Sequence, residues 1–377
     1  MATRRSELSG TYSNRPPLPS SYYEASGTIT ATGQTEITIP AMQLDVDGMS
    51  LQGSSTALNV NTAAHWDTTT GTDYSSAANR AGVDFYIYAC QPTSGTTPTL
   101  LLSANSTYPH GYTAANSRKI GGFHGLCGSV GTIANHTLTG YLTGDILPQS
   151  AWCLKHRSSS GSNVGLVYIP PIKKWCAIYL TSGSSSAPTI VFGGTILDTI
   201  TYFVANDAAR VLKMRLPTDS EFGVLAAGSN EGTNILGSAD PVTVTAAVDT
   251  AGRRMISNYG VEGCAGISQQ WLSTSSYRFD GATAHTHTYT SITGDAGSYT
   301  SGAASADVAP AWSWKNNTGG KGQLYTQGTY GDVKMVAGGC WANGAANCGS
   351  RSRDLSGYGW ASYSYIGARF ITSTIEK

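Results

Sequence analysis

Cysteine is the residue type in this sequence best suited to nucleophilic, redox or metal chemistry. The thiols belong to Cys90, Cys127, Cys153, Cys176, Cys264, Cys340 and Cys348. Their number is odd and no Cys-x-x-Cys spacing occurs, which disfavours both a disulfide framework and a structural zinc site. We therefore predict free, buried thiols that pack as small hydrophobic groups.

Two short motifs could hold a metal ion. His285 and His287 would place both imidazoles on one face of a strand, and imidazole is a common metal ligand. Because the pair lies in a Thr-rich tract, we favour a solvated loop. Asp45-Val46-Asp47-Gly48 offers two carboxylates to calcium but lacks the downstream Glu of an EF-hand loop, so a plain turn is expected. We predict no bound metal and no cofactor.

A segment near residue 360 has the composition of a recognition surface. Tyr358, Trp360, Tyr363 and Tyr365 are separated by Gly, Ala and Ser. Rigid rings supply contact area and small residues supply fit in antibody-like faces. The alternative is that Tyr363 and Tyr365 belong to an alternating core strand. Because little aliphatic mass is present for packing, we favour binding.

Composition narrows the class of protein. A chain of 377 residues exceeds one small core, which favours two or three domains. Charged residues are 12% and the formal net charge is zero, which argues against a nucleic-acid partner. The sequence contains no run of 18 consecutive apolar residues, so no membrane span is expected. The N-terminus lacks the apolar region of a signal peptide, so synthesis in a cytoplasm without export is expected.

The first half of the chain reads as β structure. Residues 1–20 contain three prolines and predict an extended arm. Residues 21–197 show alternating strands such as 83–89, and they predict a β-rich, sandwich-like domain. Apolar runs at Val164–Ile169 and Ile172–Leu180 flank two prolines and predict a hairpin.

The pattern changes near residue 198. Ile200, Phe203, Val204, Val211 and Leu212 form an apolar stripe that predicts a helix from Asp198 to Met214, before Pro217. A second helix should start at a capping box of Thr218 and Glu221 and bury Phe222, Leu225 and Ala226. Residues 198–377 therefore predict an α+β domain.

Three motifs in this second half resemble one branch of the C-type lectin fold. They are Arg215-Leu216-Pro217-Thr218-Asp219-Ser220-Glu221-Phe222, Val336-Ala337-Gly338-Gly339-Cys340-Trp341 and Ile366-Gly367-Ala368-Arg369-Phe370. They are similar, in the same order, to the helix start and two strands of the formylglycine-generating-enzyme branch. The resemblance implies a C-type lectin-like domain over residues 198–377.

Within that branch, the closer resemblance is to the variable proteins of diversity-generating retroelements. It rests on Trp341-Ala342-Asn343, Gly349-Ser350-Arg351 and Ile366-Gly367-Ala368-Arg369, together with 251–258 and 270–272. Phage tropism determinants, which sit on tail fibres and bind bacterial receptors, belong to this group. The resemblance implies display positions at Ala342, Ala345, Asp354, Leu355, Ser356, Gly357, Tyr358, Trp360, Ala361, Tyr363 and Tyr365. It implies that Trp341, Arg351 and Arg369 are scaffold.

The function that this resemblance implies is receptor binding by a phage virion. The arm and the β-rich domain at 21–197 would attach to other virion proteins, and a homotrimer would add avidity for a host surface protein or glycan. One alternative is a structural virion or head-decoration protein. Another is a copper-dependent oxidase, whose branch has two closely spaced cysteines; here Cys340 and Cys348 are eight residues apart. We therefore predict that the chain is not an enzyme.

Overall fold

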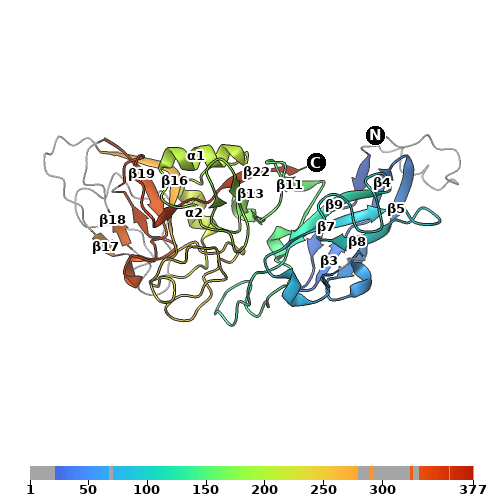
Figure 1. Ribbon diagram of the computed structural model, residues 1–377, viewed down its shortest axis with the longest axis horizontal. Coiled ribbons are helices and arrows are strands. Elements are labelled where there is room, and N and C mark those ends of the chain that lie inside the picture. The colour runs from blue at the N-terminus through green and yellow to red at the C-terminus, as the bar shows by residue number, and fades with distance from the viewer. Residues whose placement is uncertain are drawn as a thin grey trace.

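The chain is mostly β, with two α-helices among the residues that the structure describes. The computed structural model describes residues 22–67, 71–278, 289–291, 323–325, 331–355 and 357–376. Figure 1 shows two lobes, one made of the early strands and one made of the later strands and both helices. In the described part of the chain, no helix is both long and apolar enough to cross a membrane.

Two small sheets belong to the first lobe. One contains β1 (Tyr23–Ala25), β4 (Met42–Val46) and β5 (Met49–Gly53), and the other contains β2 (Thr30–Ala31), β3 (Glu36–Ile39) and β6 (Thr56–Asn59). The β4–β5 hairpin turns at Asp47 and Gly48, which both have positive φ. Asp45 accepts a hydrogen bond from the Gly48 N–H at 3.1 Å. The plain turn predicted for this acidic motif is thereby confirmed.

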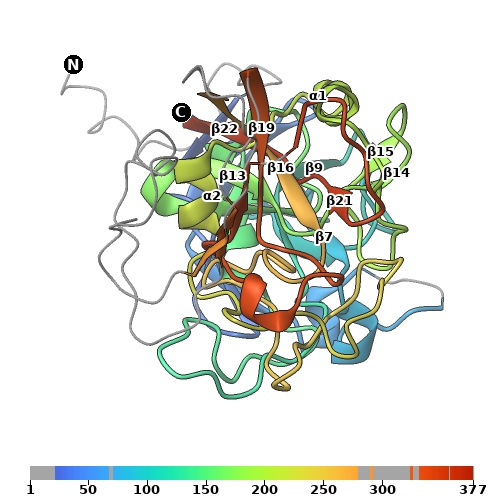
Figure 2. The same cartoon turned by 90° about the vertical axis from the view of Figure 1, so that its left-hand side faces the viewer.

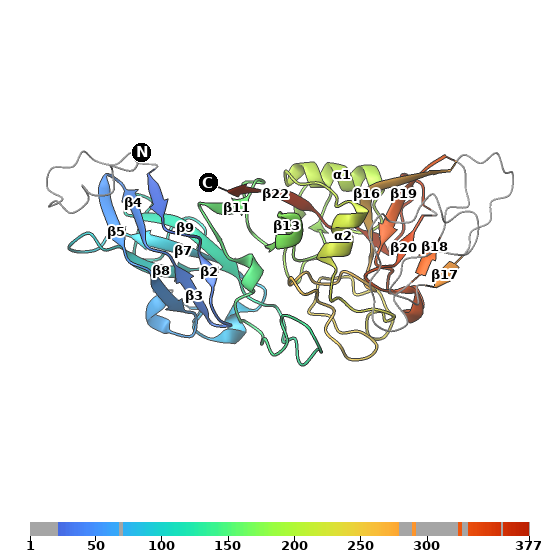
Figure 3. The same ribbon diagram turned by 180° about the vertical axis from the view of Figure 1, so that it is seen from behind.

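An eight-stranded sheet joins the two lobes. Its order is β12 (Leu166–Ile169), β13 (Lys174–Ala177), β22 (Ile371–Glu376), β11 (His156–Ser158), β10 (Trp152–Cys153), β9 (Ser117–His124), β7 (Asp84–Cys90) and β8 (Thr99–Ser103). The predicted hairpin at 164–180 is confirmed, since β12 and β13 pair antiparallel. Figure 3 shows β11 and β22 between the lobes. The C-terminal strand β22 thus lies between β13 and β11.

The second lobe carries a six-stranded sheet that positions the segment of interest. Its order is β17 (Tyr289–Ser291), β18 (Gln323–Tyr325), β20 (Arg353–Asp354), β19 (Gly331–Ala337), β16 (Gln269–Arg278) and β21 (Ile366–Gly367). A short hairpin of β14 (Ser182–Gly183) and β15 (Pro188–Thr189) lies apart from it. Residues 341–365 therefore connect β19 to β21 and contribute the short strand β20 to the same sheet.

Helix α1 (Tyr202–Val211) is shorter than predicted, and its buried face is only partly the predicted one. Its N-cap Thr201 accepts a hydrogen bond from the Val204 N–H at 3.2 Å. The buried side chains are Ala205, Ala208 and Ala209, whereas the predicted stripe leaves Phe203 and Val211 exposed. The prediction holds for Ile200, Val204 and Leu212, which pack in or against the same cluster as the alanines. It was wrong for Phe203 and Val211, because a count of large apolar residues does not detect a buried face that is centred on alanines.

Helix α2 (Asp219–Leu225) confirms the predicted capping box. Thr218 accepts from the Glu221 N–H at 3.2 Å, and Glu221 accepts from the Thr218 N–H at 2.8 Å. Phe222, Leu225 and Ala226 are fully buried, as predicted.

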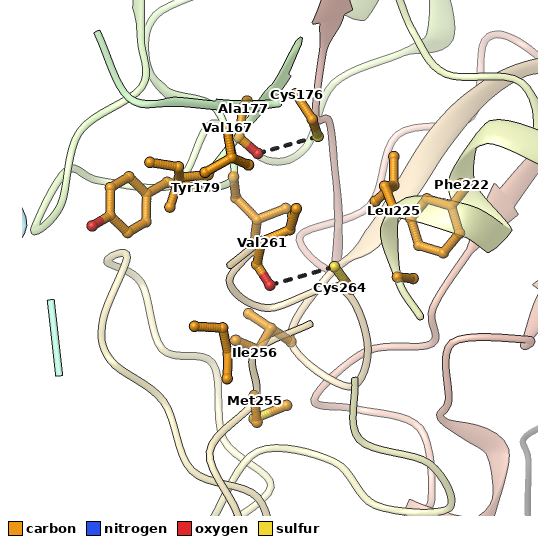
Figure 4. Packing of buried hydrophobic residues seen from close by; sticks show 14 of the residues in the cluster. Val167, Cys176, Ala177, Tyr179, Phe222, Leu225, Met255, Ile256, Val261 and Cys264 are labelled. Atoms are coloured by element: carbon orange, nitrogen blue, oxygen red, sulfur yellow. Dashed lines mark hydrogen bonds between the residues drawn. The ribbon is translucent and has the colours of Figure 1, made fainter. Parts of the chain in front are cut away.

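The largest hydrophobic cluster crosses the predicted boundary between residues 197 and 198. It joins Leu166 and Trp175 on one side of that boundary with Phe222 and Val333 on the other. Figure 4 shows part of this packing around Val261 and Cys264. A separate cluster that includes Phe85 and Ile87 fills the first lobe. The strand pair β12–β13 therefore packs with the second lobe.

Candidate binding face

Two glycines begin the segment that carries the candidate binding face. Gly338 and Gly339 follow β19 and have φ of +94° and +71°. A Cβ at Gly338 would lie 2.4 Å from the Cys264 carbonyl oxygen, and one at Gly339 would lie 2.8 Å from the Cys348 sulfur. Both the backbone angle and the space therefore require glycine here. Contacts with Cys264 and Cys348 therefore allow only glycine at positions 338 and 339.

Backbone contacts hold the first half of the segment. The Asn234 amide donates to the carbonyl oxygens of Trp341 at 3.0 Å and Asn343 at 3.2 Å. The Cys340 N–H donates to the Asn343 Oδ1 at 2.9 Å. These contacts use the side chains of Asn234 and Asn343 and main-chain atoms, and the side chain of Ala342 between them is exposed.

Contacts to α1 and the sheet hold the second half in the same way. The Tyr202 N–H donates to the Gly359 carbonyl at 3.0 Å, and the Thr199 N–H donates to the Tyr363 carbonyl at 3.2 Å. The Lys334 N–H donates to the Gly357 carbonyl at 3.0 Å. Figure 2 looks onto this end of the molecule, where α1, β16, β19 and β21 meet. The backbone is thus tied down at several points while side chains project from it.

Four rings in this half form two parallel stacks. The centroids of Tyr358 and Trp360 are 4.6 Å apart with 3° between planes. Those of Tyr363 and Tyr365 are 5.2 Å apart with 2° between planes. Trp360 is 67% exposed and Tyr363 is 49% exposed. Each stack therefore places one ring in solvent and supports it with a second ring, which limits the ordering cost of binding.

Phe203 adds a ring to this face that the sequence analysis assigned to the core. It projects from α1, and a Cβ on Gly359 would lie 3.3 Å from its ring. Its side chain is 56% exposed. The Tyr202 ring beside it packs edge-on at 5.7 Å between centroids. A helical wheel centred on the small alanines would have placed Phe203 on the outer face.

Most predicted display positions are accessible. Trp360 and Tyr363 are exposed, as is Ala342; partly exposed positions are Ala345, Asp354, Gly357, Tyr358, Ala361 and Tyr365. Leu355 is a correction, because it is fully buried in the large cluster and cannot reach a ligand from there. Ser356 lies outside the described residues. We define the binding face as the accessible positions together with Phe203.

The predicted scaffold residues occupy different depths. Arg369 is fully buried and donates to the Ala177 and Ile178 carbonyls at 2.7 and 2.6 Å and to the Gln270 amide oxygen at 3.0 Å. Trp341 is partly buried against the large cluster. Arg351 is 12% exposed, with its Nε 4.0 Å from a Glu231 oxygen.

The sequence analysis missed the most deeply buried cation of the segment, Arg353. Its side chain is inaccessible and ion-pairs through Nε with Asp219. Its Cζ lies 5.0 Å from the centroid of the Phe222 ring. Asp219 in the first turn of α2 was the available signal, since a buried carboxylate needs a cationic partner. Arg353 separates the two halves of the binding face.

The thiols of the segment are poorly suited to catalysis. Cys340 and Cys348 are fully buried, and the Cys348 thiol donates to the Cys340 carbonyl at 3.3 Å. Burial raises the pKa of Cys340 to about 11 and that of Cys348 to about 12, which disfavours the reactive thiolate. Among the described residues, no group of three His, Cys, Asp or Glu side chains could hold a metal ion. His285 and His287 lie outside those residues.

Comparison with known proteins finds relatives of this chain. Residues 41–153 match the family described as the Mtd second domain. The chain is 28% identical over 312 residues to the tail fiber receptor-binding protein of Bordetella phage BPP-1, covering 77% of this chain and 71% of that one. The resemblance to the variable proteins of the tropism-determinant group is thereby confirmed.

Solved structures give the fold more specifically. The Major Tropism Determinant U1 variant matches with a TM-score of 0.64 and 24% identity, over 93% of this chain and 84% of its own. The M1 variant matches with a TM-score of 0.65 and 23% identity, over 95% and 86%. The fold of this chain is that of the Major Tropism Determinants.

Proposed function

We propose that this chain is a phage receptor-binding protein that presents the binding face to a molecule on a bacterial surface. The observation that carries the proposal is the pair of parallel ring stacks on a segment whose backbone is held by hydrogen bonds. Side chains can change on such a segment while its main-chain contacts stay in place. The name of the Bordetella phage relative supports the same function.

The proposed organisation assigns separate roles to the parts of the chain. Residues 198–377 form a C-type lectin-like domain with the receptor face. Residues 21–197 and the arm at 1–20 attach to other virion proteins. The chain acts as a homotrimer in the virion, because three modest sites gain avidity when they engage one cell surface together. No catalytic step is assigned to it.

Binding of purified protein to host cells tests the function. We expect the Y358S/W360S/Y363S/Y365S variant to lose cell binding and to fail as a competitor of phage adsorption. The matched control is Tyr108→Ser, which removes a ring that is 40% exposed outside the face. Unchanged thermal melting must accompany the loss of binding. Adsorption that survives the four substitutions would overturn the proposal and favour a structural virion role.

Light scattering during gel filtration tests the oligomer. A homotrimer has three times the 39.3 kDa of one chain. A mass of one chain at micromolar concentration would contradict the proposed trimer and leave the receptor face untouched.

A further inference from the structure

A pocket lies on the eight-stranded sheet and shares no lining residue with the binding face. It encloses about 220 Å³, and its walls include Tyr86 from β7, Lys119 from β9, Trp152 from β10 and Arg157 from β11. Pockets for drug-sized ligands measure roughly 300–1,000 Å³. A ligand of this pocket must therefore be small.

A β-bulge brings the aromatic and cationic side chains onto the same face of the sheet. Tyr86 pairs with Gly122 and Tyr88 pairs with Lys119, so β9 has one extra residue between these pairs. The extra residue lets Ile120 enter the core of the first lobe and returns Lys119 to the outer face. The Lys119 Nζ then lies 4.5 Å from the centroid of the Tyr86 ring.

Gly122 leaves space for the Trp152 indole, which forms the pocket wall opposite Tyr86. Gly122 pairs with both Tyr86 and Trp152 across the sheet. A Cβ at Gly122 would lie 2.7 Å from the Trp152 indole nitrogen. The indole therefore lies over the glycine, and the two aromatic residues stand on the strands that flank β9, on either side of Gly122.

The pocket contains positive charge with no carboxylate among its lining residues. Arg157 makes no ion pair within the described part of the chain, and Lys119 donates to the Ser106 carbonyl at 2.5 Å. Burial lowers the pKa of the Lys119 ammonium, as expected for a cation that lacks a nearby anion. The closest acid along β7, Asp84, is engaged by the Gly165 N–H at 3.0 Å and by His124 at 3.0 Å.

Unpartnered donors in the wall add to this positive potential. Asn163 is 9% exposed, and its Oδ1 accepts from the Ser158 N–H at 3.3 Å, which orients the amide. The Asn163 Nδ2 and the Arg157 Nε are buried and have no hydrogen-bond partner. Buried donors without acceptors are costly to a fold and often mark a site that a ligand completes.

We propose that this pocket binds an oxyanion, a phosphate or carboxylate group, either free or carried on a small sugar. The Arg157 guanidinium supplies the forked donors that suit such a group, and the Lys119 ammonium supplies a second positive charge. The Tyr86 and Trp152 rings form apolar walls that a sugar ring can contact. The pocket shares no residue with the proposed receptor face, so a failed test of one proposal leaves the other standing.

Calorimetric titration of the full chain at constant ionic strength tests the proposal. The probes are inorganic phosphate, glucose 6-phosphate, glucuronate and uncharged glucose. We expect binding of at least one anionic probe and no comparable heat from glucose. Tighter binding of glucose 6-phosphate than of inorganic phosphate would identify a sugar-borne group, and equal binding would identify the free oxyanion. If no anionic probe binds, or if glucose binds as tightly, the proposal is wrong.

Charge-removing variants connect the binding to the pocket. Arg157→Gln should weaken the anionic probe about tenfold or more, as expected for the loss of a charged hydrogen-bond donor. Arg157→Lys keeps the positive charge but not the forked donors, so its affinity for the anionic probe should lie between those of the natural chain and Arg157→Gln. Lys173→Gln is the control, because it removes one positive charge from an exposed position outside the pocket. Equal weakening by both Gln variants would show a nonspecific charge effect and overturn the assignment.

Discussion

Arg353 and Asp219 form a buried ion pair that ties β20 to the first turn of α2. The Arg353 guanidinium also packs over the Phe222 ring of the same helix. Its Nη1 donates to the Ser350 and Ser352 carbonyls at 3.0 and 2.9 Å. One side chain therefore anchors the middle of the segment 341–365 to a helix outside it. This anchor uses none of the side chains of the binding face on either side of Arg353.

Arg353→Ala should be strongly destabilising. It leaves the Asp219 carboxylate buried without its cation, which typically costs about 3–5 kcal/mol of unfolding free energy. Urea unfolding followed by fluorescence measures this change. Arg210→Ala is the control, since the Arg210–Asp207 pair is highly exposed and should have no measurable effect. A loss below about 1 kcal/mol at Arg353 would contradict the anchoring role.

Two tryptophans should separate stability from binding. Trp271 is fully buried and its indole donates to the Ile200 carbonyl at 2.9 Å, so Trp271→Ala should cost about 3–5 kcal/mol. Trp360 is 67% exposed, so Trp360→Ala should cost no more than about 1 kcal/mol. Parallel unfolding curves for the two variants provide the comparison. A larger loss at Trp360 would mean that this ring serves the fold.

The carboxylate of Glu221, which caps α2, should make the free energy of unfolding depend on pH. Burial alone would raise the pKa of Glu221, but hydrogen bonds from Arg215 at 2.8 and 2.5 Å and from the Thr218 N–H outweigh it and lower that pKa. Because the folded pKa is the lower one, the stabilisation is present above the unfolded value of about 4.3 and is lost as pH falls through the folded pKa.

The Glu221→Gln variant measures that dependence. The difference in unfolding free energy between the natural chain and the variant should be largest near neutral pH and should shrink below about pH 4.3. Chemical unfolding at a series of pH values gives both curves. A difference that stays constant down to the acid limit of the folded state would rule out the carboxylate as its source.

The buried thiols should resist modification in the folded protein. All seven cysteines are free and buried. Burial raises the pKa of Cys340 to about 11 and of Cys348 to about 12, so the thiolate is scarce at pH 8. A disulfide reagent should label less than one thiol per folded chain and all of them in denaturant. Rapid labelling of either residue in the folded chain would reopen the question of thiol chemistry.

Local signals in the sequence predicted local structure well. The capping box at Thr218 and Glu221 and the hairpin around Pro170-Pro171 were predicted from neighbouring residues, because their hydrogen bonds lie within a few positions. The predicted buried side of α1 was wrong at Phe203 and Val211, since alanine contributes little to an apolar stripe yet forms the centre of the buried face here. Long-range pairing of β22 with β11 and β13 left no local signal.

The sequence predicted which residue types make up the candidate face but not how deeply each side chain is buried. Alternation of small and aromatic residues located Trp360 and Tyr363 correctly on the surface. It gave no means of separating Leu355, which is buried, from Asp354 beside it, which is partly exposed. That separation depends on the short strand β20, whose pairing with β19 fixes which side chains face the core. Phe203 was missed because it comes from a distant helix.

The place of β22 in the chain has a consequence for mutations that truncate the protein or shift its reading frame. This strand follows the segment 341–365 and fills the space between β13 and β11 in the eight-stranded sheet. A stop codon or frameshift within that segment removes β22, so β11 and β13 lose their common partner. A chain ending at residue 350 should therefore be insoluble on expression, and soluble recovery would disprove this dependence. The eight-stranded sheet can therefore be completed only in chains in which residues 341–365 are translated in frame.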